Sequence, residues 1–217
     1  MRKLRYAVFL FVPVALGTLA ALPAKKPAAA CVVANAWVNE HKGELPTTWA
    51  EFSNFDRAHR QAIYAALTAP QKLGLWHEQF ERYRLRDSLT AEQIAHLSEV
   101  EHLIATVLAR GNTGVTRGSQ TDSLVRRTAA KGRVLFGTAK AREYFLILGQ
   151  TLEAPAKRAT VQDCNCDTWG TSASECDSGA GNRCVPIGQY NCEYHSFGCG
   201  DFMFYSCDGF CKAAETD

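Results

Sequence analysis

The chain lacks the short motifs that mark the common classes of catalytic site. It has no Gly-x-Ser-x-Gly motif, no phosphate-binding loop and no dinucleotide-binding fingerprint. The stretch from His77 to Glu81 begins like the helix of a zinc protease, but the second histidine of that motif is missing. His96 and His102 lie six residues apart, so a helix presents them on different faces. The sequence therefore predicts no enzyme, no metal site and no cofactor.

Cysteine is missing from residues 32–163, yet eight of the nine cysteines follow within a short, polar C-terminal segment. Such a segment cannot bury enough apolar area to offset its conformational entropy, so it needs covalent cross-links. A disulfide closing a loop of about 15 residues contributes roughly 3 kcal/mol. Residues 164–217 are therefore predicted to form a disulfide-rich module of loops and short β-strands, with no pairing selected among Cys164, Cys166, Cys176, Cys184, Cys192, Cys199, Cys207 and Cys211.

Zinc is the alternative for this cluster, because Cys164 with Cys166 and Cys207 with Cys211 could each offer two thiolates. The N-terminus favours disulfides. A basic start is followed by an apolar run from Tyr6 to Leu22 and then by small residues, which is the layout of a secretory signal peptide. Residues 1–30 are predicted to be removed by signal peptidase, with a retained anchor as the alternative. A secreted, extracellular chain oxidises its cysteines.

Cys31 stands apart from the cluster. The preceding alanines loosely suggest a lipoprotein cleavage site, with lipid attached to Cys31. However, the apolar run ends well before it, and Lys25 and Lys26 intervene. The favoured interpretation is an unpaired thiol in a segment that is later removed.

Residues 31–153 are predicted to form a mainly α-helical domain of five or six helices. Capping signals start helices after Thr48, Asp56, Thr68 and Thr90. A break is expected from Gly111 to Ser123, then a short helix over Ser123 to Ala130 and a firmer one from Thr138 through Leu148.

Two side-chain patterns within this domain have structural explanations. Trp76, Phe80 and Tyr83 recur at helical spacing and are expected to face the core. The arginines Arg82, Arg84 and Arg86 are flanked by acidic residues on both sides, which is typical of a solvated helix face and not of a nucleic-acid site.

A linker is predicted over residues 154–163, because it is rich in small residues and contains Pro155. Its dibasic pair, Lys157 and Arg158, is a candidate site for a processing protease. Charge divides here as well: residues 1–158 carry 22 Lys and Arg against 13 Asp and Glu, and residues 159–217 carry 2 against 9. One hypothesis is that the helical domain cradles and masks the acidic segment until cleavage; the alternative is that the acidic charge only keeps it soluble.

Several short stretches of the helical part and of the C-terminal segment together carry a resemblance to a known family. They are Asp163–Cys166, Gly198–Gly200, the aromatic residues Phe202, Phe204 and Tyr205, and, in the helical part, Trp37–Val38, Leu45–Thr48, Arg60–Leu67, Leu75–Trp76 and Leu89–Gln93. With these stretches, the layout resembles the fulvocin C-related bacteriocin precursor family. The resemblance spans nearly all of the chain after the signal, and residues 207–211 fit it less well. It implies a secreted precursor whose disulfide-rich end is an antibacterial peptide, and it brings no catalytic residues.

The acidic charge of the C-terminal segment argues against killing by attraction to anionic membranes, since only Arg183 and Lys212 are basic. The segment has eight aromatic residues from Trp169 onward, which either anchor a protein or cell-envelope target on a competitor cell or pack over the disulfides. The alternative function is an uncleaved secreted or lipid-anchored binding protein, with the cystine-rich module as its recognition surface.

Overall fold

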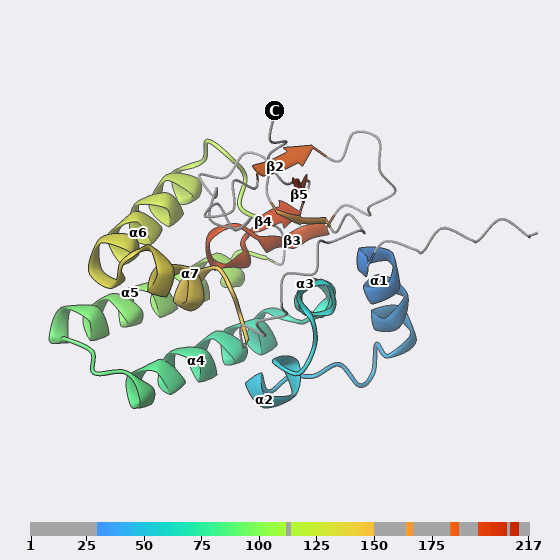
Figure 1. The fold of residues 1–217 in the computed structure, drawn as a ribbon, viewed down its shortest axis with the longest axis horizontal. Coiled ribbons are helices and arrows are strands. Elements are labelled where there is room, and N and C mark those ends of the chain that lie inside the picture. The colour runs from blue at the N-terminus through green and yellow to red at the C-terminus, as the bar shows by residue number, and fades with distance from the viewer. Residues whose placement is uncertain are drawn as a thin grey trace, which may run out of the picture.

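The computed structural model describes residues 30–111, 114–149, 164–166, 183–186, 195–207 and 209–212 (Figure 1). A mainly helical part precedes a small module of short strands, as expected. Within the described ranges there are seven α-helices against the five or six expected, and the additional one is α1, whose start the sequence analysis did not identify. They are α1 (Ala30–Glu40), α2 (Trp49–Phe52), α3 (Arg57–Ala66), α4 (Ala69–Arg86), α5 (Ala91–Ala109), α6 (Gln120–Phe136) and α7 (Thr138–Phe145).

Local capping explains where several helices begin. The Asp56 carboxylate accepts a hydrogen bond from the backbone N–H of His59 at 2.9 Å, so α3 starts where the sequence predicted. Thr90 and Gln93 form a reciprocal capping box at the start of α5, and Pro70 occupies the first turn of α4. These starts are confirmed.

The prediction for α6 was wrong. A short helix over Ser123 to Ala130 was expected, but α6 runs for 17 residues from Gln120 to Phe136. It starts earlier because the Ser119 side chain accepts from the Asp122 N–H at 3.0 Å. It continues through Gly132, where the missing side chain makes room for the ring of Phe145. The following helix, α7, ends at Phe145, before the expected Leu148.

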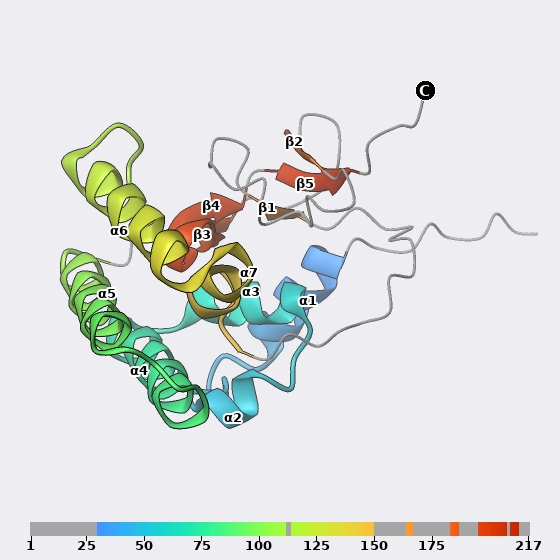
Figure 2. The same ribbon diagram turned by 60° about the vertical axis from the view of Figure 1, so that its left-hand side comes forward.

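The aromatic stripe of α4 lies in the core, as predicted. Trp76 and Phe80 are fully buried and Tyr83 is nearly so. The Tyr83 ring stacks on Tyr144 of α7, with ring centroids 3.9 Å apart. Figure 2 shows α4, α5 and α6 along one side of the molecule, with α7 and α3 closing the core from the other.

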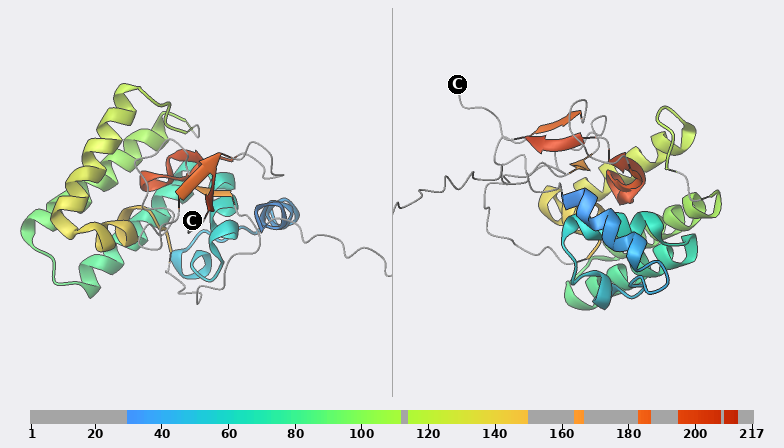
Figure 3. Two further views of the ribbon diagram at one scale, coloured as in Figure 1. Left: turned by 45° about the horizontal axis from the view of Figure 1, so that its top comes forward. Right: turned by 90° about the vertical axis from the view of Figure 1, so that its right-hand side faces the viewer.

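The strands form two separate antiparallel sheets. The three-stranded sheet has the order β1 (Cys164–Cys166), β5 (Gly209–Lys212), β2 (Arg183–Pro186). The two-stranded sheet pairs β3 (His195–Cys199) with β4 (Tyr205–Cys207), and the short 3-10 helix η2 (Asp201–Met203) connects them. Strand β3 packs on α3, and η2 packs on α6 and α7, whereas β2 and β5 lie farther out (Figures 2 and 3).

The two parts share one hydrophobic core. Phe202, Met203, Phe204 and Tyr205 belong to the same cluster of buried side chains as the α4 aromatic residues. The C-terminal module is therefore anchored in the helical part through residues 198–205, which we call the docked loop.

Substitution at Gly132 tests this packing. A Cβ atom there would lie 2.5 Å from Cε2 of Phe145, so Gly132→Ala should destabilise the protein by about 1–3 kcal/mol. Gly74→Ala in α4 is the matched control, because nothing lies within 4 Å of its added Cβ; it should stabilise by about 0.5–1 kcal/mol. Urea unfolding followed by circular dichroism measures both. Equal stabilisation by the two variants would contradict the packing of Gly132 against Phe145.

Candidate functional site

The strongest candidate site is the socket that holds the docked loop. We define the socket by Gln61 of α3, Trp76 of α4, Asp122 and Arg133 of α6, and Phe145 of α7. The side chains of Gln61, Asp122 and Arg133 contact the docked loop through hydrogen bonds, and those of Trp76 and Phe145 through their rings.

Gln61 holds the entrance of the loop. Its side-chain Nε2 donates to the carbonyl oxygen of Gly198 at 3.1 Å and lies 3.2 Å from Sγ of Cys199. Gly198 has a φ of +114° and packs directly on Gln61, with its hypothetical Cβ 3.3 Å from that of Gln61. Only glycine adopts this backbone without strain, and only glycine permits so close an approach.

The tip of the loop is inserted among aromatic rings. Phe202 is fully buried, and its ring meets Trp76 edge-on at 6.5 Å and Phe145 at 5.7 Å between centroids. Phe202 and Met203 both have left-handed backbone, with φ of 59° and 58°. Each costs about 1–2 kcal/mol for an L-amino acid, so the burial of their side chains must offset this strain.

An ion pair between a half-buried arginine and a buried aspartate fixes the loop to α6. Nη1 of Arg133 donates to Oδ1 of Asp201 at 3.0 Å, and Asp201 is 5% exposed. Burial raises the pKa of Asp201, and the guanidinium of Arg133 opposes that rise. Removing Arg133 would therefore leave a carboxylate in the core without its partner, which is far more costly than losing an exposed pair.

The carboxylate of Asp122 binds the C-terminal end of the docked loop. The Tyr205 hydroxyl donates to Oδ1 of Asp122 at 2.7 Å. Burial alone would raise the pKa of Asp122, but hydrogen bonds from Tyr205, the Gly118 N–H and Arg126 outweigh it and hold that pKa below its ordinary value. The N–H of Val115 also donates to the Phe204 carbonyl at 2.9 Å, so the segment before α6 covers the loop.

A disulfide between Cys199 and Cys207 closes the base of the docked loop, with Cα atoms 5.2 Å apart. This pair confirms a disulfide within the predicted cluster. Cys184 and Cys211 are opposite each other in the β2–β5 register, and Cys164 and Cys166 begin and end β1. The other two predicted cysteines, Cys176 and Cys192, lie outside the described residues. The disulfides expected for these six stay predictions.

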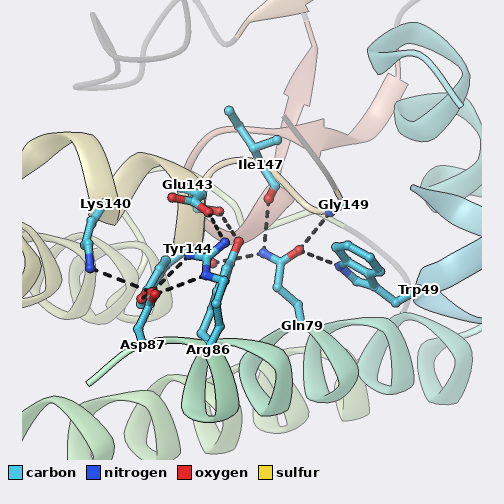
Figure 4. Close-up of polar contacts among 10 residues, drawn as sticks. Trp49, Gln79, Arg86, Asp87, Lys140, Glu143, Tyr144, Ile147 and Gly149 are labelled. Atoms are coloured by element: carbon cyan, nitrogen blue, oxygen red, sulfur yellow. Dashed lines mark hydrogen bonds and ion pairs between the residues drawn. The ribbon is translucent and has the colours of Figure 1, made fainter. Parts of the chain in front are cut away.

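A polar cluster fixes the end of the helical part (Figure 4). Gln79 is fully buried, and its Nε2 donates to the carbonyls of Tyr144 and Ile147 at 3.2 and 3.0 Å. Its Oε1 accepts from the Gly149 N–H at 2.7 Å and from Nε1 of Trp49 at 3.1 Å. These contacts therefore fix the position of the main chain at Gly149, five residues before the predicted linker.

Charged residues continue this cluster along the surface. Arg86 pairs with Asp87 at 3.0 Å and with Glu143 at 2.9 Å, Lys140 lies 3.7 Å from Asp87, and the Tyr144 hydroxyl donates to Asp87 (Figure 4). Hydrogen bonding from Arg86 is the main reason that the pKa of Asp87 falls to about 2, and Tyr144 adds to it.

Several other predicted features fall partly or wholly outside the described residues. The processing pair Lys157 and Arg158, most of the signal segment 1–30 and the linker 154–163 are among them. Cys31 lies in the first turn of α1, and its side chain is not among those described. The Gln61, Asp122 and Arg133 side chains were not identified by sequence reasoning; the only signal for the socket was the run Phe202–Tyr205, which is too apolar for an acidic surface segment.

The two histidines of α5 lie apart, as their spacing predicted. His96 is buried between Phe136 and Phe145, and His102 is exposed. Among the described residues, no group of three or more His, Cys, Asp or Glu side chains is placed to hold a metal ion. In the same part of the chain, no helix combines the length and apolarity needed to cross a membrane. The chain matches no protein-family model, no curated protein and no solved structure.

The pKa of Asp87 gives a pH test of the polar cluster. Its folded-state pKa lies below its unfolded value, so the stability that Asp87 contributes is present above pH about 4 and is lost as pH falls towards 2. Asp87→Asn should therefore flatten the dependence of unfolding free energy on pH in this window, measured by urea unfolding at several pH values. Glu44→Gln, at an exposed position, is the charge-matched control. An unchanged pH dependence in Asp87→Asn would contradict the assignment.

Proposed function

We propose that this chain is a secreted, bacteriocin-like precursor. Residues 1–30 direct export, residues 31–153 form a helical pro-domain, and the disulfide-stapled segment 164–217 is the antibacterial effector. The observation that supports this division is the docked loop: the helical part provides a socket for the C-terminal module. The resemblance to fulvocin C-related bacteriocins adds the effector role.

In this proposal the pro-domain masks the module until processing. The socket engages it through both charge and apolar burial, since Arg133 meets Asp201 and the rings of Trp76 and Phe145 meet Phe202. Cleavage at Lys157 and Arg158 removes the covalent connection only. The module stays bound until the docked loop leaves the socket, so release is a step separate from proteolysis.

The effector would act on a defined protein or cell-envelope target of a competitor cell. Its net negative charge gives no attraction to anionic lipid, and no nucleic-acid partner is expected for the same reason. The aromatic side chains of the module whose burial the structure describes, those of Phe202, Phe204 and Tyr205, are buried against the helices. In the precursor they are neither exposed anchors nor packed only over disulfides, and release would expose them.

A second candidate function is an uncleaved secreted or lipid-anchored binding protein. The observation that favours it is the shared core: the helical part loses four buried residues, Phe202 to Tyr205, if the module departs. If the two parts fold as one cooperative unit, cleavage of the linker between them would serve no function. The recognition surface would then lie on the part of the module away from the socket.

The secreted product distinguishes the two candidates. The precursor proposal predicts a fragment of about 6 kDa that begins after Lys157 and Arg158 in the culture medium. Mass spectrometry of the medium and of the membrane fraction, before and after reduction, gives the ends of the product and its number of disulfides. An intact chain without its signal, in either fraction, supports the binding protein, and absence of any product from both fractions would contradict both candidates.

Cleavage in the linker should leave the two parts associated. After cutting the purified chain between residues 150 and 163 at an inserted protease site, we expect both fragments to co-elute in size-exclusion chromatography. Phe202→Ala should cost about 3–5 kcal/mol of burial and release the module. Leu85→Ala, at a residue that is 86% exposed, should not. Separation of the wild-type fragments after the cut would show that the socket does not hold the module.

Killing should depend on the target and not on bulk lipid. The released module should inhibit sensitive cells without releasing dye from protein-free anionic vesicles, because it carries net negative charge. Cell growth and vesicle fluorescence are measured at the same module concentrations. Dye leakage at inhibitory concentrations would contradict the proposed mode of action.

A further inference from the structure

The docked loop has a backbone that its own sequence does not favour. Gly198 and Gly200 have φ of +114° and +70°, and the non-glycine residues Phe202 and Met203 follow in the left-handed region. The intrinsic backbone preferences of L-amino acids favour other conformations for Phe202 and Met203. The contacts that hold them in place include those of the Phe202 ring with Trp76 and Phe145 in the helical part.

This backbone brings Cys199 and Cys207 together. Their Cα atoms are 5.2 Å apart, within the usual range for a disulfide, at a sequence separation of 8. Cys192 is an equally available partner for Cys199 by chain length, at a separation of 7. From loop-closure entropy alone, the Cys192–Cys199 and Cys199–Cys207 disulfides would form in a ratio of only about 1.2 to 1. Chain length therefore does not select the pair that forms.

The helical part holds the segment between these two cysteines in place. Phe202 lies between the two cysteines in sequence, so its insertion beside Trp76 and Phe145 fixes the turn that joins them. Gln61 holds one side of the base, because its Nε2 contacts both the Gly198 carbonyl and Sγ of Cys199. An N–H donor at that position also stabilises a thiolate, the reactive form of cysteine.

We propose that the helical part is a template for oxidative folding, which directs Cys199 to pair with Cys207. This rests on the proposed function only in that the chain oxidises after export. The oxidant is a disulfide, for which oxidised glutathione serves as the probe. One cysteine thiolate attacks it, forms a mixed disulfide and expels one glutathione thiolate. The second cysteine thiolate attacks the protein sulfur and expels the other. Two protein thiols are oxidised to one disulfide, and one glutathione disulfide is reduced to two thiols.

Refolding of the full-length chain tests the template. The reduced, denatured protein is diluted into a glutathione redox buffer, free thiols are blocked at successive times, and the first disulfides are mapped by mass spectrometry. In the wild type, Cys199–Cys207 should exceed Cys192–Cys199 by about tenfold or more, because docking raises the effective concentration of the two thiols. A wild-type ratio near 1 would overturn the proposal.

Two variants separate templating from general folding. Phe202→Ser removes the inserted ring and should bring the ratio of the two pairings close to 1. Phe210→Ser, in β5 of the same module, is its control and should keep the wild-type ratio. Gln61→Met keeps the side-chain volume but removes the N–H donor, and it should lower the ratio several-fold. Gln120→Met, at an exposed position of α6, is its control.

Circular dichroism of each variant shows whether the helices remain. If Phe202→Ser loses its helices, the test rests on Gln61→Met, and a wild-type ratio of the two disulfides in Gln61→Met would then overturn the proposal. If Phe202→Ser keeps its helices, a wild-type ratio of the two disulfides in Phe202→Ser would overturn the proposal. The readout is independent of killing, so an inactive module with selective pairing refutes the effector role alone. An active module with unselective pairing refutes the template alone.

Discussion

The burial of Phe202 and Phe204 inside the helical part is the interaction on which the structure depends. Both are fully buried, and they come from a segment of the chain that follows the last α-helix by more than fifty residues. Each buried phenylalanine side chain contributes about 1.5–3 kcal/mol relative to exposure. That gain stabilises a strained backbone in the loop and joins an acidic, cross-linked module to a basic helical part.

Polar groups make the same junction specific. An apolar loop tip could slide within an apolar pocket, but the pairs Arg133–Asp201 and Asp122–Tyr205 fix both of its ends. Each lies at the edge of the core, where removing one partner leaves a buried polar group unsatisfied. Aromatic burial provides the attraction, and these two contacts set the position of the loop on α6.

Local features of the fold were predictable from sequence, and distant ones were not. Asp56 and Thr90 mark helix starts because capping is a contact between neighbours in the chain. The Trp76 stripe identifies a core face for the same reason, since helical periodicity is local. The length of α6 was underestimated because Gly132 is a weak helix former whose place depends on packing against Phe145.

The socket could not be predicted, because its contacts join residues far apart in the chain. Gln61 and Gly198 are 137 positions apart, and no spacing rule connects them. The cysteine count predicted cross-links in the module, but the pairing of Cys199 with Cys207 depends on the docked backbone and not on spacing.

The position of the docked loop near the C-terminus also governs when the core can close. The ribosome adds the residues of the seven α-helices first, and residues 150–201 must follow before Phe202 is added; at about 5–20 residues per second this takes about 3–10 s. Until then, the helices lack the ring that packs against Trp76 and Phe145. The shared core can therefore be completed only after nearly the whole chain has been made.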